Sequence, residues 1–496
     1  MPTRTSPDSF RPPVDAGRGR RRPFLMTADR SIIGTLCLFL LVRALIPASA
    51  FGGQADLVSA PKRTPVSPER EASAAFKNSD YDRVTRLLES ARMESKPSRE
   101  LIRLGFLSYL RLGRPEEALK LYPRLVPASR SDDPGLLRQL ALSFITSRVR
   151  DPQEHVRIAA YTALAEIGEP ETAPVLEDGL LDSSVFVRAR AAGAIGKAGL
   201  AAKSGALKRV LRDETPAVRI AAINALAEAR ATDVTEELTQ LARRDEGPES
   251  IFALAGLVRF GKSDALIDIM NAATLPDPEA RMAAIGVLGR LKRPSSLAVL
   301  SQAVYDPDPS VRAFAAGALG EFGDPRGMAP LVHALEDESA RVRGIAAASL
   351  GRLGLADARG FIIPLTRDPV GHVRAGAVEG LLRLGDATAV LVAADLAKHS
   401  DPSVRGAAAQ ALAAATSPKA LPVLEALLRD QQPLPRLMAA KALGKIGLPD
   451  VIPLLKKGLE DTDPAVRIAA AGGIIEVLSR GKASKKARHR PRGSPC

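Results

Sequence analysis

Residues 306–323 read Asp-Pro-Asp-Pro-Ser-Val-Arg-Ala-Phe-Ala-Ala-Gly-Ala-Leu-Gly-Glu-Phe-Gly, and this pattern returns along most of the chain. Its arginine recurs at intervals of 31 residues or twice that. The series comprises Arg157, Arg188, Arg219, Arg281, Arg312, Arg343, Arg374, Arg405, Arg436 and Arg467. Ser250 stands at the one place where an arginine is missing, so the chain has eleven such places, called arginine slots below. A fixed period of this length predicts a repeat architecture, in which each unit packs on its neighbours.

Two further positions of the repeat are apolar in every unit. Alanine lies three residues past all eleven slots, and Leu or Ile lies seven residues past them. Spacings of three and four place these side chains on one face of a helix, so each slot opens a second helix that follows a shorter first one. Seven glycines are placed to end these second helices in the left-handed conformation. They are Gly168, Gly199, Gly261, Gly323, Gly354, Gly385 and Gly447.

Eight slots are preceded, six residues earlier, by an aspartate that is able to cap the coming helix. These are Asp151, Asp182, Asp213, Asp306, Asp337, Asp368, Asp430 and Asp461. The combined unit, Asp-x-x-x-x-Val-Arg-x-x-Ala-x-x-x-Leu-Gly, resembles the short bacterial HEAT repeats of the PBS-lyase type. The resemblance covers residues 133–479 and implies an all-α, right-handed α-solenoid of eleven helix pairs. It also implies that the repeated Asp and Arg side chains form a structural ladder between neighbouring repeats. At 8–10 Å per packed helix, we expect an elongated superhelix on the order of 100 Å long.

Charge is concentrated at the two ends of the chain. Of the formal net charge of +14, residues 1–50 hold eight Arg and three Asp, and residues 480–496 hold seven Lys or Arg and no acidic residue, which leaves +2 for residues 51–479. The array is therefore close to neutral, which disfavours a specific nucleic-acid partner. We expect residues 480–496 to form a basic disordered tail. Such a tail suits electrostatic contact with an acidic envelope surface, or serves only as a solvated end.

The N-terminal region has the features of an export signal. A basic lead precedes the apolar stretch 31–42, and Ala48-Ser49-Ala50 offers a cleavage site. We therefore expect residues 1–50 to be removed and the mature protein to reach the periplasm or cell envelope. Three alternatives stay open: a true start at Met26, a twin-arginine motif at residues 21–25, and an uncleaved inner-membrane anchor formed by residues 31–50.

A different helical repeat is predicted ahead of the array. After a disordered linker at residues 51–64, Tyr109, Gly113, Ala118 and Tyr122 follow the order typical of tetratricopeptide repeats. Pairs of like positions 34 residues apart support this interpretation. Residues 65–132 therefore resemble TPR hairpins that cap the array, with a generic helical cap as the alternative.

Catalytic and cofactor motifs are missing from the sequence. Deoxyhypusine hydroxylases, which share this repeat type, bind iron through His-Glu pairs, and no His-Glu dipeptide occurs here. The sequence also contains no Gly-rich phosphate loop, Gly-x-Ser-x-Gly elbow or Cys-x-x-Cys motif. We accordingly predict no cofactor, no metal site and no enzymatic activity.

The expected function is binding of a protein or peptide along the concave face, which the second helices line in HEAT arrays. Positions two, five and nine past the slot point away from the predicted core, and the nine-past position is charged in ten of eleven repeats. The candidate partner-binding residues are Phe252, Arg259, Arg290, Phe314, Ile345, Arg352 and Arg383. Arginines beside apolar residues suit an extended acidic peptide. The alternative is an accessory subunit or lyase-like protein that handles a small molecule or pigment, as PBS-lyase relatives do.

Overall fold

The computed structural model describes residues 67–94, 96–127, 131–244 and 247–488. The predicted signal peptide at residues 1–50 and the predicted linker at residues 51–64 both lie outside these ranges. Within the described ranges the regular structure is helical, and no strand occurs. The residues within these ranges form one compact unit. None of the helices in the described part has the length and apolar content needed to cross a bilayer.

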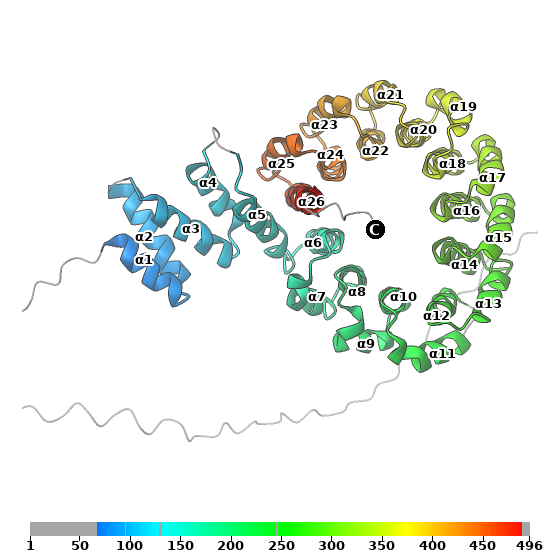
Figure 1. Ribbon diagram of the computed structural model, residues 1–496, viewed down its shortest axis with the longest axis horizontal. Helices are drawn as coiled ribbons and strands as arrows, with labels where there is room; N and C mark the ends of the chain where they lie inside the picture. The colour runs from blue at the N-terminus through cyan, green and yellow to red at the C-terminus, as the bar shows by residue number, and fades with distance from the viewer. Residues whose placement is uncertain (1–66, 95, 128–130, 245–246, 489–496) are drawn as a thin grey trace, which may run out of the picture. The chain divides into compact units, whose positions relative to one another are not determined.

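The array consists of eleven helix pairs within the described residues, as the period predicts (Figure 1). The first helices of the pairs are α5 (Pro134–Thr146), α7 (Ala173–Gly179), α9 (Gly205–Arg209), α11 (Thr235–Arg244), α13 (Ala265–Ala272), α15 (Leu297–Gln302), α17 (Met328–His333), α19 (Ala358–Ile362), α21 (Ala389–Leu396), α23 (Leu421–Leu427) and α25 (Ile452–Gly458). The second helices are α6 (Glu154–Ile167), α8 (Val185–Lys197), α10 (Pro216–Glu228), α12 (Pro248–Arg259), α14 (Pro278–Leu291), α16 (Pro309–Phe322), α18 (Ala340–Leu353), α20 (Gly371–Arg383), α22 (Pro402–Leu412), α24 (Pro433–Ile446) and α26 (Pro464–Arg488).

Short 3-10 turns flank many of the first helices. They are η1 (Pro170–Thr172), η2 (Ala201–Lys203), η3 (Val210–Arg212), η4 (Thr232–Val234), η5 (Pro294–Ser296), η6 (Ala303–Tyr305), η7 (Pro325–Gly327), η8 (Ala334–Glu336), η9 (Ile363–Arg367), η10 (Pro418–Ala420) and η11 (Pro449–Val451).

The two invariant apolar positions form the core of the array. All eleven three-past alanines are fully buried, from Ala160 to Ala470. The seven-past Leu and Ile residues are buried too, and the most exposed of them, Leu257, retains only 6% of its surface. A small alanine lets adjacent second helices approach closely, and the larger side chain fills the space one turn later.

The seven predicted cap glycines all adopt positive φ, between 63° and 96°. Arg230 and Lys292 take the same left-handed conformation at the equivalent place in repeats that lack this glycine. A residue with a Cβ atom is strained there, so these two repeats form the turn despite a local cost.

The aspartate before each slot does not act as the helix N-cap, contrary to our expectation. In the second repeat the N-cap is Ser184, and Asp182 lies two residues earlier. The Asp182 carboxylate accepts the backbone N–H of Ser184 at 2.8 Å and so closes an Asx turn. The chain needs these two extra residues to reverse direction before the second helix begins.

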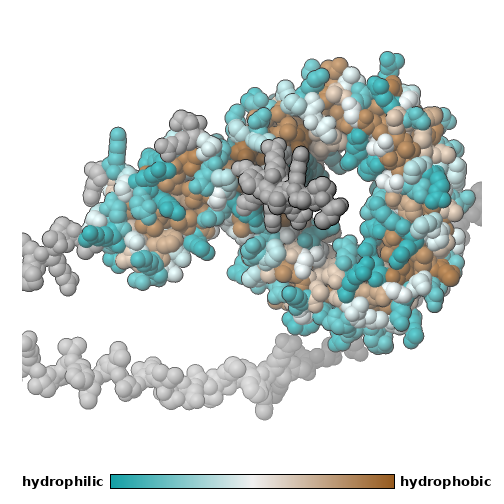
Figure 2. Space-filling model, viewed as in Figure 1, coloured by the Kyte–Doolittle hydropathy of each residue, from teal (hydrophilic) through white to brown (hydrophobic). Residues whose placement is uncertain are grey.

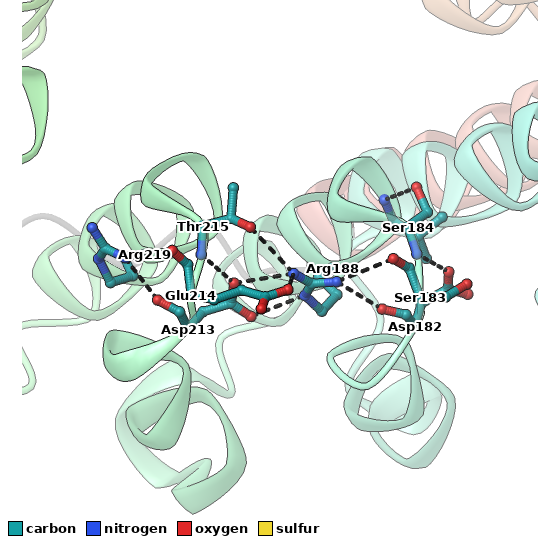
Figure 3. A network of polar contacts seen from close by, with 9 residues as sticks. Asp182, Ser183, Ser184, Arg188, Asp213, Glu214, Thr215 and Arg219 are labelled. Atoms are coloured by element: carbon teal, nitrogen blue, oxygen red, sulfur yellow. Dashed lines mark hydrogen bonds and ion pairs between the residues drawn. The ribbon is translucent and has the colours of Figure 1, made fainter. Parts of the chain in front are cut away.

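The same carboxylates receive the arginines of the preceding repeat (Figure 3). Arg188 donates from Nε and Nη2 to the Asp213 carboxylate at 2.9 and 3.1 Å, and from Nη1 to the Asp182 carbonyl at 3.0 Å. Each arginine thus joins the turn of its own repeat to the turn of the next by bidentate, charge-assisted bonds. We call each such arginine–carboxylate pair a rung of the ladder. Equivalent rungs join Arg157 to Asp182, Arg281 to Asp306, Arg312 to Asp337, Arg343 to Asp368, Arg405 to Asp430 and Arg436 to Asp461.

One rung is rebuilt and two are absent among the described residues. Arg219 bonds Glu249, which replaces the missing aspartate between the third and fourth repeats. Ser250 carries no guanidinium, so the rung between the fourth and fifth repeats is lost. Between the eighth and ninth repeats His399 occupies the aspartate position, and the buried Nε atom of Arg374 has no hydrogen-bond partner in the described part of the chain.

The array closes on itself instead of extending as an open superhelix. Helix α26 packs against α5 and α6 of the first repeat (Figure 1). Lys456 donates to Asp132 at 2.9 Å and Lys441 to Glu166 at 3.0 Å across this junction, which we call the seam. Each stacking step adds a small rotation, and eleven steps of the same sense complete a ring.

Between residue 67 and the array the structure has four helices, namely α1 (Pro68–Lys77), α2 (Tyr81–Glu94), α3 (Arg99–Arg111) and α4 (Pro115–Leu125). Gly113 takes a φ of 67° in the turn between α3 and α4, and Tyr109, Ala118 and Tyr122 are buried. The positions chosen for the tetratricopeptide pattern therefore lie in a turn and a core, and the assignment to that repeat class stays a prediction.

The C-terminal boundary of the array differs from our expectation. Helix α26 extends to Arg488, whereas we placed the start of a disordered tail at residue 480. Residues 480–488 contain mostly Arg, Lys and Ala, which favour helix, and proline first appears at Pro491.

Candidate functional site

The inner face of the ring is built by the second helices, and the first helices form the outer layer (Figure 1). Figure 2 shows an opening through the ring that hydrophilic side chains border. The residues two, five and nine positions past each arginine slot are predicted to line this inner face.

A groove of about 500 Å³ crosses α14, α16 and α18 on this inner face. It brings together four of the seven predicted residues, Arg290, Phe314, Ile345 and Arg352. Phe314 is 44% exposed, which is unusual for a phenylalanine. Gly286 and Gly317 occupy the five-past positions and leave the floor of the groove open.

Arg290 is a partly buried charge of the groove. Its side chain is half-buried, and its guanidinium lies 5.4 Å from the centre of the Phe252 ring. Its Nη2 atom is buried and has no hydrogen-bond partner among the described residues. Burial lowers the pKa of Arg290 from its ordinary value, because the charged form has lost water. A carboxylate from outside the chain would replace the missing solvation.

Arg352 is held in place by its own neighbours. It donates from Nη2 to the Ser349 hydroxyl at 2.8 Å and from Nη1 to Glu379 at 3.3 Å. Glu379 also accepts from Arg383 at 3.0 Å, so one carboxylate is shared by two arginines. This small network lies at one edge of the groove and keeps a surplus of positive charge.

The other predicted residues lie beside the groove or away from it. Phe252 supports Arg290 from the adjacent repeat, and Arg259 occupies the nine-past position of that repeat without lining the groove. Arg383 bonds Glu379 and does not line it either. The seven residues therefore do not form one continuous strip.

Sequence reasoning missed Arg341 and Glu379. Arg341 lies two residues before its slot, one helical turn from Ile345, and lines the groove. That i, i+4 relation was visible in the sequence. Glu379 occupies a position that is mostly small in other repeats. Its pair with Arg383 is an i, i+4 pair within α20, whereas its pair with Arg352 depends on the distance between α18 and α20.

Groups of acidic, histidine or cysteine residues suited to a metal ion do not occur in the described ranges. His333 stacks on Tyr305, with ring centres 4.7 Å apart. His399 accepts the backbone N–H of Asp401 through Nδ1 at 3.1 Å, as the aspartates do in other repeats. Both histidines therefore have structural contacts.

Solved structures with similar chains include human deoxyhypusine hydroxylase in complex with glycerol, with 20% identity, coverage of 45% of this chain and 99% of that one, and a TM-score of 0.26. The CpcE–CpcF complex of phycocyanin lyase from Nostoc sp. PCC7120 has 20% identity, coverages of 49% and 94%, and a TM-score of 0.34. Kap95p, in a structure with RanGDP, has 13% identity, coverages of 86% and 67%, and a TM-score of 0.34.

No match is found among the curated proteins. The family model for HEAT repeats matches residues 130–196, 181–250, 298–381, 359–436 and 425–481, which is more than half of the chain. These segments coincide with the stacked helix pairs and with most of the arginine rungs described above. The chain belongs to the HEAT-repeat family.

Proposed function

We propose that this protein is a non-catalytic scaffold of the cell envelope that holds a segment of a partner protein against the inner face of its ring. The observation that carries the proposal is a contrast between repeat positions on that face, where residues at the same place in successive repeats form a column. The five-past positions are mostly small and leave room, whereas the neighbouring columns carry charged and apolar side chains. Such a surface offers both buried area and directed polar contacts to a polypeptide.

The charges of the inner face favour a protein over nucleic acid. Along the nine-past column six basic residues alternate with Glu166, Glu228, Glu321 and Glu476. A polyanion would meet these acidic residues at intervals and would be repelled there. A polypeptide can match the mixture of signs with its own side chains.

Site-specific photo-crosslinking tests where a partner binds. A photoreactive amino acid is introduced at Glu321 or Gln410 on the inner helices, and at Leu391 on the outer helix α21; all three positions are exposed. We expect crosslinks to a discrete protein from the inner positions and none from Leu391. Crosslinks from Leu391 alone would place binding outside the ring and contradict the proposal.

Export is a separate part of the proposal and rests on the sequence of residues 1–50. We expect cell fractionation to recover the protein with the envelope. N-terminal analysis should find a mature chain that begins near Phe51. A cytoplasmic protein that retains Met1 or Met26 would refute export and leave the binding proposal to the crosslinking result.

A further inference from the structure

The structure points to a specific occupant for the groove across α14, α16 and α18. We infer that it binds an extended partner segment in which an apolar residue lies midway between two carboxylates about six residues apart. This inference rests on the proposed function and adds the chemistry of the partner.

The floor of the groove has room for an apolar side chain. A Cβ atom placed on Gly286 would meet no other atom within 4 Å, and one on Gly317 would approach only Ile345, at 3.7 Å. Phe314 and Ile345 border this space with apolar surface that is partly exposed. An apolar residue of the partner would cover Phe314 and gain from leaving water.

The two edges of the groove carry the positive charges that determine the spacing of the two carboxylates in the partner segment. Arg290 on α14 and Arg352 on α18 occupy the same repeat position two repeats apart. Packed helices lie about 8–10 Å apart, so the axes of α14 and α18, which carry these arginines, are separated by roughly 16–20 Å. An extended chain advances about 3.3 Å per residue and covers that distance in five or six residues.

The centre of the groove excludes a uniformly acidic ligand. Glu321 on α16 lies between the two arginines in the repeat order and is exposed. A carboxylate opposite Glu321 would be repelled, whereas an apolar residue would not. Discrimination of this kind arises from a repulsive group as much as from the attractive ones.

Synthetic peptides test this arrangement directly. The probe is a fluorescein-labelled peptide with one leucine midway between two aspartates six residues apart, in an Ala and Ser background. The first control replaces both aspartates by asparagine, and the second keeps the composition but places the aspartates side by side. We expect the probe to bind the full-length protein at least about tenfold more tightly than either control in fluorescence anisotropy.

Two matched glycine variants link binding to the groove. Gly286→Leu fills the floor, whereas Gly193→Leu adds the same side chain at the same repeat position in α8, where a Cβ atom also meets nothing within 4 Å. Both changes remove a helical glycine and favour the helix, so neither is expected to unfold the ring. Gly286→Leu should abolish probe binding, and Gly193→Leu should leave it unchanged.

Each outcome separates this inference from the general proposal. Equal binding of the three peptides, or full binding by Gly286→Leu, overturns the inference while inner-face crosslinks still support a scaffold. If benzoate or succinate binds at the groove and the peptide does not, a small-molecule ligand replaces the partner segment. Loss of inner-face crosslinks as well would overturn both proposals.

Discussion

At the scale of single residues, the stability of the ring depends on whether each ladder arginine finds a carboxylate. Arg312 is 11% exposed and Asp337 is 10% exposed, so their bonds form in a largely desolvated place. Arg374 occupies the same position, but within the described ranges it donates only to the carbonyl oxygens of Asp368 and Pro369. A partly buried charge without its partner lowers the stability of the folded protein. Restoring a carboxylate opposite Arg374 therefore tests how much one rung contributes.

We predict that His399→Asp stabilises the protein by about 1–2 kcal/mol, because the new carboxylate would accept from the unpaired Nε of Arg374. An aspartate at this position can also accept the backbone N–H of Asp401, which His399 now accepts through Nδ1. Urea denaturation measures the gain, and His399→Asn serves as the uncharged control. Equal stability of the two variants would contradict the ladder as a source of stability.

The ladder also predicts how the protein responds to acid. The hydrogen bond from Arg405 holds the pKa of Asp430 below its ordinary value. A carboxyl group whose pKa is lower in the folded state contributes stability above its unfolded pKa, near 4, and loses it as the pH falls through the folded pKa. We therefore expect the free energy of unfolding to fall below about pH 4.

The variant Asp430→Asn isolates this effect. It should be less stable than the wild type at pH 7 and should lose less stability on acidification, since one of the titrating groups is gone. Parallel pH profiles for the two proteins would show that Asp430 does not take part.

At the scale of helices and repeats, the missing rungs divide the array. Rungs are absent between α12 and α14 and between α20 and α22, among the described residues, and Glu249 restores the one before α12. In a solenoid each repeat is stabilised mainly by its neighbours, so a weaker interface opens locally.

We predict faster amide hydrogen exchange at residues 262–277 and 386–400 than at the equivalent residues 324–339, where Arg312 joins Asp337. His399→Asp should slow the exchange at 386–400 only. Uniform exchange across the three segments would show that the rungs do not determine local stability.

Much of the structure within a repeat could be predicted from the sequence, because it depends on residues close together in the chain. The period of 31 residues, the buried Ala315 and Leu319, and the left-handed Gly323 each follow from spacing within one repeat. The pairing of Glu379 with Arg352 could not be predicted, since it depends on how far one second helix lies from the next. The role of Asp182 as an Asx turn rather than an N-cap depends on the exact start of α8.

At the scale of the whole molecule, closure of the ring is the feature that the repeat pattern did not reveal. A small rotation per repeat accumulates over eleven steps, and no single repeat contains enough information to fix the sum. At the seam, α26 contacts both α5 and α6, and Lys441 and Lys456 bind residues that lie far away in the sequence.

Charge reversal should open this seam. Lys441 is 29% exposed and Lys456 is 34% exposed, so each ion pair is individually weak, but Lys441→Glu with Lys456→Glu would add two repulsions. We expect a larger radius of gyration by small-angle scattering. Adding Glu166→Lys and Asp132→Lys should restore the original value, and failure to restore it would mean that the pairs do not hold the seam.

Closure bears on the proposed binding mode, because a ring encloses what an open solenoid only borders. Spin labels at Gln139 on α5 and Arg480 on α26, with Cys37 and Cys496 replaced by serine, measure this directly. Each label lies next to a seam residue, since Arg138 donates to Ser479 at 3.5 Å. The closed ring predicts a single narrow distribution at short distance, whereas a broad distribution toward the roughly 100 Å span of eleven stacked repeats would contradict it.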